Sequence, residues 1–76
     1  MKTSSININK NILGGTPVFS RTRVPIQNLF DYLEGGQTIE EFLYGFPSVT
    51  KEQVIEVLAL AEKILTSEKF HYEDFA

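Results

Sequence analysis

The sequence contains no cysteine and no tryptophan, and it has a single histidine, His71. The lack of cysteine excludes disulfide bonds and thiolate metal sites, and one histidine is too few for a zinc site built on imidazole ligands. No apolar run approaches the roughly 20 residues of a membrane-spanning helix, and the first residues lack a signal-peptide core. These absences favour a cytoplasmic protein with no metal or other cofactor and no membrane contact.

Acidic residues are absent from the first thirty positions, which makes the charge of the chain asymmetric. Residues 1–30 carry four cations, whereas residues 31–76 carry all ten acidic residues and three lysines. The two parts have formal charges of +4 and −7, which give the net charge of −3. This net charge argues against strong nonspecific binding of nucleic acid, because phosphate contacts supply most of that affinity. The basic part by itself is suited to phosphate.

At 76 residues, the chain has room for a single domain. A domain of this size buries only about 60–65% of the surface that its unfolded chain exposes, so its own core stabilises it weakly. Because disulfides and thiolate metal sites are excluded, self-association is the remaining source of stability, and we expect a homodimer. We predict a flexible arm over residues 1–5, one domain over residues 6–66, and an acidic, aromatic tail over residues 67–76.

The start of the domain has the pattern of a short β-hairpin. Residues 5–9 alternate between polar and apolar side chains, which is typical of a half-buried strand. Gly14 and Gly15 mark a turn, and residues 17–19 form a second strand that can pair with the first. Pro17 restricts this strand to an edge, or to a start at the proline itself, because proline has no N–H to donate.

Two short amphipathic helices follow the hairpin. The first begins at Pro25, which suits the first helical position, and ends at Gly35-Gly36. The second is opened by Thr38 with Glu41 as its reciprocal capping partner and is stopped by Pro47. Their apolar stripes are Ile26, Leu29, Phe30 and Leu33 in the first helix, and Ile39, Phe42, Leu43 and Phe46 in the second.

A third, longer helix is predicted from Thr50, with Gln53 as its capping partner, to about Thr66. Its apolar face is broader than two short helices can cover. The face consists of Val54, Ile55, Val57, Leu58, Leu60, Ala61, Ile64 and Leu65. Either a partner surface or the N-terminal hairpin covers the excess width.

The tail combines aromatic and acidic side chains without a helical or strand period. Such a segment is either a disordered end or one that becomes ordered on a partner. The candidate partner-binding residues are Leu60 and Ile64 on the third helix and Phe70, Tyr72 and Phe75 in the tail.

Catalytic groups are not indicated anywhere in the chain. His71 lies in the irregular tail with no serine or cysteine arrangement around it. Gly14 and Gly15 lack the spacing and the following lysine of a phosphate loop. We therefore expect a protein that is not an enzyme and has no small-molecule substrate.

The order of turns and helix breaks resembles a known family. The signature reads Gly15-x-Pro17-Val18-x-x-x-Thr22-Arg23-Val24-Pro25. After it come a short helix, Gly36, a second capped helix, Phe46-Pro47 and a long helix opened by Thr50. This pattern is similar to domain-of-unknown-function family 433, over about residues 6–65. The motif residues are Gly15, Pro17, Thr22, Arg23 and Pro25.

That family is similar to antitoxins of the VapB kind and is grouped with homeodomain-like folds. The resemblance implies a mainly α fold, in which a short N-terminal β-hairpin or arm precedes a three-helix homeodomain-like (helix-turn-helix) bundle. Family members are often paired with a PIN-like ribonuclease toxin. The resemblance therefore implies such a toxin as the protein partner, and autoregulated transcription through operator DNA.

One position departs from the family pattern, which has glycine immediately before the Thr-Arg pair where this sequence has Arg21. If the backbone there requires a positive φ, an arginine costs about 1–2 kcal/mol. Either the turn accepts any residue, or the strain is tolerated because an additional cation is useful.

The cations of the basic part are the candidate DNA contacts: Lys2, Lys10, Arg21 and Arg23. Arg23 presents a planar fork of donors that suits either phosphate or carboxylate. It is therefore either a phosphate ligand or the partner of an acid within its own bundle, such as Asp31. Thr22 is expected to supply a turn or capping hydroxyl.

In a helix-turn-helix, the later helix enters the major groove by its N-terminal residues. Here that turn contains Lys51, Glu52 and Gln53, and Glu56 follows one turn later. Two carboxylates facing phosphate oppose such docking. We therefore expect any DNA contact from the basic part, with the third helix facing protein.

These patterns lead to one main hypothesis and one alternative. The main hypothesis is an antitoxin-like binding protein that neutralises a PIN-like ribonuclease toxin through the tail and third helix and contacts operator DNA through its basic part. The alternative is a homo-oligomeric adaptor with no nucleic-acid role, in which the basic part of one copy pairs with the acidic part of another.

Overall fold

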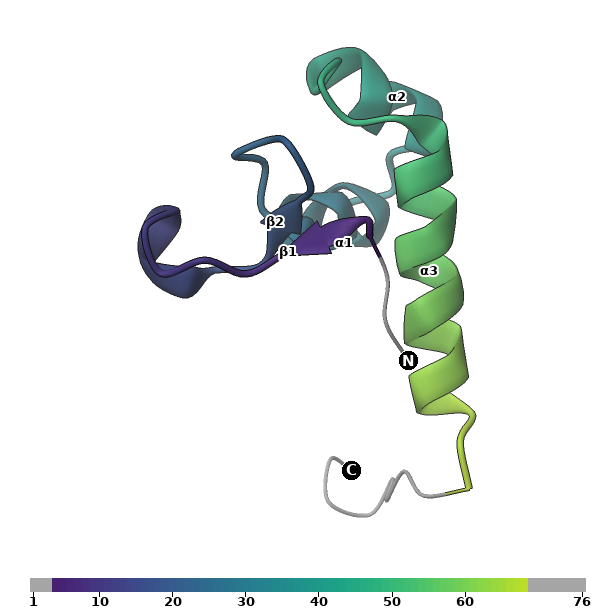
Figure 1. Ribbon diagram of the computed structural model, residues 1–76. Coiled ribbons are helices and arrows are strands. Elements are labelled where there is room, and N and C mark those ends of the chain that lie inside the picture. The colour runs from purple at the N-terminus through teal and green to yellow at the C-terminus, as the bar shows by residue number, and fades with distance from the viewer. Residues whose placement is uncertain (1–3, 69–76) are drawn as a thin grey trace.

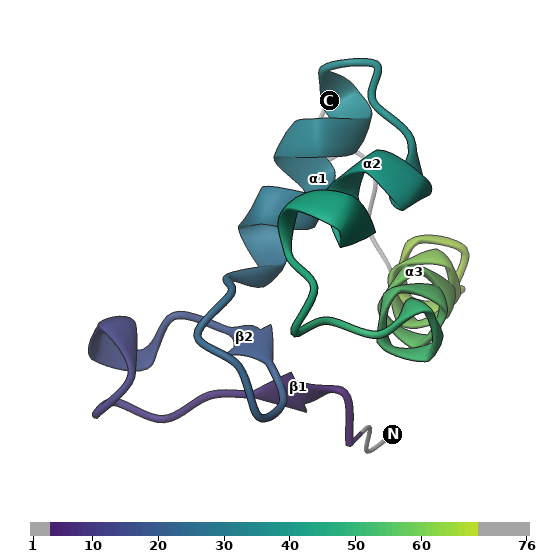
Figure 2. The same cartoon turned by 90° about the horizontal axis from the view of Figure 1, so that it is seen from above.

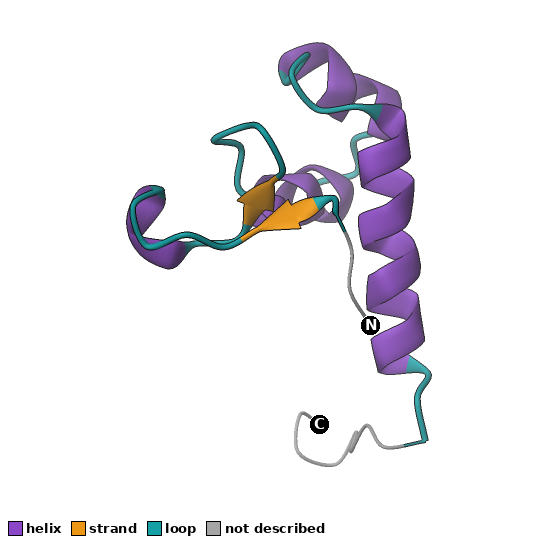
Figure 3. Cartoon of the chain, viewed as in Figure 1, coloured by secondary structure: helices purple, strands orange, loops and turns teal. Residues whose placement is uncertain are grey.

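The computed structural model describes residues 4–68, over which a short antiparallel sheet is followed by three helices (Figure 1). In chain order the elements are β1 (Ile6–Asn7), a 3₁₀ turn η1 (Leu13–Gly15), β2 (Val18–Phe19), α1 (Ile26–Glu34), α2 (Ile39–Gly45) and α3 (Lys51–Leu65). Helices account for most of the regular structure (Figure 3). The predicted mainly α fold, with three helices behind an N-terminal β-hairpin, is confirmed.

The β-hairpin is shorter than the sequence pattern predicted. Ile6 pairs with Phe19 and Asn7 pairs with Val18. Ile8, which the alternation placed on a half-buried strand, lies beyond β1 and is 66% exposed. The prediction was wrong for Ile8, because pairing with β2 ends at Asn7 and Val18 and the carbonyl of Pro17 accepts the Ile26 N–H instead.

Both predicted capping boxes are present. The Thr38 hydroxyl accepts the Glu41 N–H at 3.0 Å, and the Glu41 carboxylate accepts the Thr38 N–H at 2.7 Å. Thr50 and Gln53 form the same reciprocal pair at 3.1 and 3.0 Å. Pro25 is the N-cap of α1 and not its first helical residue, because its ψ of 141° is extended.

The core forms where β2, α1, α2 and the start of α3 meet. Phe42 joins these layers, because its ring centroid lies 5.8 Å from that of Phe19, 5.5 Å from that of Tyr32 and 5.0 Å from that of Phe46. The fully buried side chains are Val18, Phe19, Leu29, Phe42 and Val54. Tyr32 was outside the predicted stripe of α1 and packs edge-to-face against Phe42.

α3 stands at the edge of this core. In Figure 2 it is seen nearly end-on, with α1, α2 and the hairpin all to one side of it. Figure 1 shows its C-terminal half running past α1 and the hairpin. The apolar stripe of α3 is therefore divided: its first two turns contribute to the core, and its last turns lie outside.

Candidate interaction surfaces

Residues 20–23, between β2 and α1, carry two of the predicted DNA contacts, and we call them the basic turn. The Phe19 N–H donates to the Val24 carbonyl at 2.9 Å, and the Thr22 N–H donates to the Phe19 carbonyl at 3.1 Å. The Thr22 hydroxyl donates to the same Phe19 carbonyl at 2.7 Å and accepts the Val24 N–H at 3.0 Å. Thr22 thus supplies a turn hydroxyl, as predicted.

Arg21 occupies the position of this turn at which the backbone is left-handed. Its φ is 63°, a region that glycine enters freely and that costs other L-residues about 1–2 kcal/mol. The interpretation that this turn accepts any residue is therefore wrong. The strain is present, and a cation stands where glycine would relieve it.

Gln53 ties the basic turn to α3. Its Nε2 donates to the Ser20 carbonyl at 3.1 Å, while its Oε1 accepts the Thr50 N–H at 3.0 Å. The side chain is 7% exposed, and such shielding from water strengthens hydrogen bonds. The sequence indicated only the capping role, because the contact with Ser20 spans 33 positions and has no local signal.

The guanidinium groups of the basic turn are not neutralised by the described part of the chain. Arg21 and Arg23 are both exposed, and within residues 4–68 neither forms an ion pair. The alternative in which Arg23 pairs with Asp31 is wrong, because no ion pair joins these two side chains. Asp31 instead accepts a hydrogen bond from Gln27 Nε2 along α1 at 3.0 Å. Lys10, in the loop before η1, is exposed as well.

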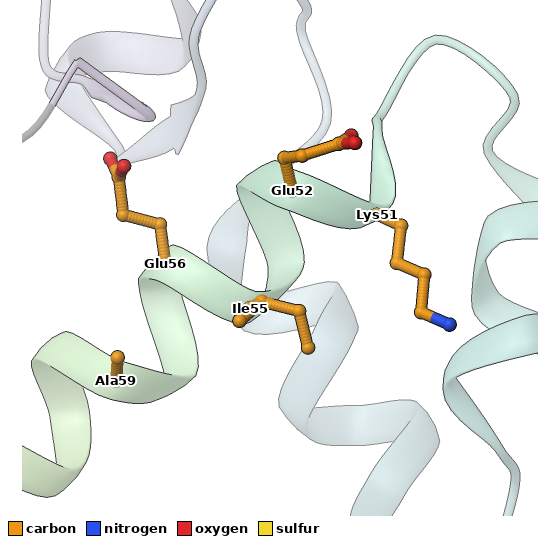
Figure 4. Close-up of a pocket in the computed structure, with 5 residues that line it drawn as sticks. All are labelled: Lys51, Glu52, Ile55, Glu56 and Ala59. Carbon is orange, nitrogen blue, oxygen red and sulfur yellow. The ribbon is translucent and has the colours of Figure 1, made fainter.

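The outer face of α3 is the one that a helix-turn-helix protein would present to DNA. It forms a shallow groove of about 490 Å³ lined by Lys51, Glu52, Ile55, Glu56 and Ala59 (Figure 4). Figure 4 shows Glu52 and Glu56 extending to the same side of the helix. Two carboxylates on this side repel the phosphate backbone, so this face is unsuited to DNA.

The core-facing stripe of α3 continues past the bundle. Ile64 lies about two helical turns after Val57, and Leu65 lies about three turns after Val54, so each pair shares a face. Val57 and Val54 are 4% and 0% exposed, whereas Ile64 and Leu65 are 50% and 48% exposed. We call Ile64, Leu65 and the half-buried Leu60 the α3 overhang.

The hairpin covers the start of α3 and not the overhang. Phe19 of β2 belongs to the same core cluster as Val54 and Val57, and Ser20, which follows β2, accepts a hydrogen bond from Gln53 in the first turn of α3. Ile64 and Leu65 stay about half exposed, so the alternative in which the hairpin covers the excess apolar width is wrong for this half of α3. Within the described residues, this end of the apolar face of α3 stays about half exposed.

Several predicted site residues lie outside the described residues. These are Lys2 among the DNA contacts, and Phe70, Tyr72 and Phe75 among the partner contacts. His71 also lies outside them. Among residues 4–68 there is no group of three His, Cys, Asp or Glu side chains placed to hold a metal ion. No helix in this range combines the length and apolar character needed to cross a membrane.

The fold and these surfaces define the class of protein: a small three-helix domain with a β-hairpin, an exposed basic turn and an exposed apolar helix end. A family model described as "Protein of unknown function (DUF433)" matches residues 6–61. The chain belongs to this family, and the resemblance seen in the sequence is confirmed.

A curated relative from Sinorhizobium fredii (strain NBRC 101917 / NGR234) bears the description "Uncharacterized protein y4eO". It is 35% identical to this chain over 49 residues, which are 64% of this chain and 22% of the relative. The match thus spans less than a quarter of the relative's length. No solved structure matches the chain.

Proposed function

We propose that this chain is an antitoxin-like binding protein that neutralises a PIN-like ribonuclease toxin through the α3 overhang and contacts operator DNA through the basic turn. The α3 overhang is the observation that carries the proposal. In this function the protein has no catalytic centre of its own and acts by covering the surface of another protein.

The α3 overhang has the form of a helix-in-groove contact, in which an amphipathic helix lays its apolar stripe into a partner. Ile64 and Leu65 are the large side chains of this stripe that stay about half exposed. Removing apolar surface from water contributes about 25 cal/mol per Å². Because α3 is already folded and capped at Thr50, binding does not require the helix to form first.

The charge around the α3 overhang favours a basic partner. Residues 51–68 contain four acidic residues and two lysines. A second α3 packed against the first would bring like charges together, whereas a basic protein would meet the surface with opposite charge. Such complementarity raises the association rate and selects against the wrong partner.

The basic turn is suited to phosphate because its shape is already set. Thr22 and Gln53 hold its backbone, and Arg21 and Arg23 extend from it without an intramolecular ion pair among residues 4–68. Arginine pairs with phosphate through two parallel hydrogen bonds. A preformed turn loses little conformational freedom when it binds.

A matched pair of variants on α3 tests the toxin contact. Ile64 and Ile55 are each 50% exposed. Ile64 follows Ile55 by nine positions, about two and a half turns, which puts the two side chains on opposite sides of α3. Each variant, Ile64→Glu and Ile55→Glu, is co-expressed with the neighbouring gene product, and ribonuclease activity and complex affinity are measured.

We expect Ile64→Glu to weaken the complex at least about tenfold, as loss of a central apolar contact does, and Ile55→Glu to leave it within about twofold. Equal effects of the two variants would place the contact elsewhere. Full ribonuclease activity in the presence of the unaltered chain would refute the antitoxin function.

A further inference from the structure

A groove of about 420 Å³ lies between the C-terminal end of α1 and α2. Its lining residues are Tyr32, Gln37, Glu40, Glu41, Tyr44 and Gly45. We call it the tyrosine groove. It is separate from the basic turn, from the α3 overhang and from the outer face of α3, so the proposed function makes no use of it.

Two tyrosines give this groove its aromatic character. Tyr44 is 91% exposed, more than any other large hydrophobic side chain of residues 4–68. Gly45 keeps the Tyr32 hydroxyl accessible, because a Cβ at position 45 would lie 3.0 Å from that oxygen. Within residues 4–68 the Tyr32 hydroxyl has no hydrogen-bond partner. An exposed tyrosine such as Tyr44 is a typical contact residue of protein interfaces.

The charge around the tyrosine groove is negative. Residues 31–50 contain four acidic residues and no lysine or arginine, and the negative end of the α1 dipole adds to them. Glu40 pairs with Lys51 at 3.8 Å, but their side chains are 74% and 64% exposed, and such surface pairs are weak. The groove therefore suits a guanidinium group, which can stack on a tyrosine ring while its donors pair with a carboxylate.

We propose that the tyrosine groove receives an arginine of the basic turn from a second copy of this chain, so that two copies associate head to tail. Arg21 and Arg23 form no ion pair within residues 4–68 of their own subunit. The braced turn presents them at little entropic cost. A second copy supplies a cation to a groove whose lining residues include no lysine or arginine, and a chain of this size gains stability from association.

This association stands independently of the proposed function, although it uses the same arginines. Phosphate and the groove carboxylates compete for one set of guanidinium groups. Nucleic acid therefore displaces the second copy from the tyrosine groove, and self-association falls as DNA is added.

Sedimentation of the full chain, alone and in mixtures, tests the contact. The turn variant carries Arg21→Gln and Arg23→Gln and keeps an intact tyrosine groove. The groove variant carries Glu40→Arg and Tyr44→Ala and keeps an intact basic turn. All four side chains are exposed, so the fold is retained. The controls Lys63→Glu and Glu62→Arg change the net charge equally, at exposed positions of α3.

We expect the unaltered chain to self-associate at about 50 mM salt and to dissociate at least tenfold more readily at about 500 mM, because salt screens exposed charges. The turn variant and the groove variant each weaken association about tenfold or more, and both controls stay within about threefold. An equimolar mixture of the two variants associates more tightly than either alone, because it contains one intact turn and groove pair.

Three results would overturn the head-to-tail contact: a monomeric unaltered chain at low salt, equal losses in the charge-matched controls, or a mixture no tighter than its components. Loss of association in Ile64→Glu would assign the self-contact to the α3 overhang instead. The assay contains neither toxin nor DNA, so its failure leaves the proposed function standing, and failure of the toxin assay leaves this contact standing.

Discussion

The two halves of α3 carry the same apolar stripe and have different surroundings. Val57 is 4% exposed, because β2, α1 and α2 meet around the first two turns of the helix. Ile64 lies on the same face about two turns later, where no described element covers it, and it is 50% exposed. An apolar stripe thus specifies the orientation of a helix, whereas the length of its neighbours decides how much of the stripe is buried.

A similar contrast separates neighbouring side chains of the basic turn. The hydroxyl of Thr22 forms hydrogen bonds within the fold, whereas the guanidinium groups of Arg21 and Arg23 on either side of it form no ion pair within residues 4–68. Side chains that hold the scaffold and side chains available for binding therefore alternate along a single turn.

The largest expected effect tests the difference in burial between the two halves of α3. Val57→Asp buries a charge without a partner, which is among the most destabilising of changes, so we expect a loss of about 4 kcal/mol or more in the free energy of unfolding. Ile64→Asp, on the same face outside the core, is expected to cost about 1 kcal/mol or less. Urea unfolding of both variants measures the difference, and similar losses would contradict the division of the helix.

A second prediction sharpens the distinction between a local cap and a long-range contact. Gln53→Ala removes a capping partner and the bond to Ser20, and leaves a half-buried carbonyl unsatisfied, so we expect a loss of about 2 kcal/mol. Glu41→Ala removes the equivalent residue of the exposed capping box of α2 alone, at about 1 kcal/mol. If thermal unfolding gave equal losses, the bond from Gln53 to Ser20 would have no energetic role.

Thr22 allows a similar test within the basic turn. Thr22→Val keeps the shape of the side chain and removes the hydroxyl that bridges Phe19 and Val24, so we expect a loss of about 1–2 kcal/mol. Thr22→Ser keeps the hydroxyl and should retain most of the stability that Thr22→Val loses. Chemical denaturation of the pair gives the comparison, and an unaffected Thr22→Val variant would show that backbone bonds alone hold the turn.

The smallest expected effect is a gain in the free energy of unfolding, whereas the variants above lose stability. Arg21→Gly relieves a positive φ of 63° and should stabilise the fold by about 1 kcal/mol. If Arg21 contacts phosphate, the same change lowers DNA affinity and reduces the slope of log affinity against log salt by about 0.9. Arg23→Gln is the matched control. We expect it to reduce the slope in the same way, without a gain in stability. A gain in stability with an unchanged slope would remove Arg21 from the DNA contact.

The local parts of the fold could be predicted because their causes lie within a few positions. Each capping box joins a threonine to a residue three positions later, as at Thr38 and Thr50. The break at Pro47 and the family signature depend on neighbouring residues in the same way. Pro25 was misplaced by one position, because φ of proline suits both the cap and the first helical residue.

The candidate sites were less predictable because they depend on packing. In the sequence Arg23 had two possible partners, phosphate or an acid of its own bundle such as Asp31, and only the structure showed that no ion pair joins it to Asp31. Tyr44 lies outside the predicted apolar stripe of its helix, but no pattern in the sequence indicated the tyrosine groove. Tyr32 and Tyr44 belong to different helices, and the groove exists because Gly45 places no side chain against the Tyr32 hydroxyl.

The sequence by itself determined the elements of this protein, the caps that begin its helices and the separation of its charges, because each of these follows from residue types and short spacings. Only the tertiary structure decided which half of α3 is buried, that Arg21 adopts a left-handed backbone and that Gln53 reaches Ser20. The burial of α3 and the contact of Gln53 with Ser20 depend on segments far apart in the chain, and the free energy of bringing them together is not a property of any local pattern. The left-handed backbone at Arg21 depends on how the turn between β2 and α1 closes, which the residue type alone does not indicate.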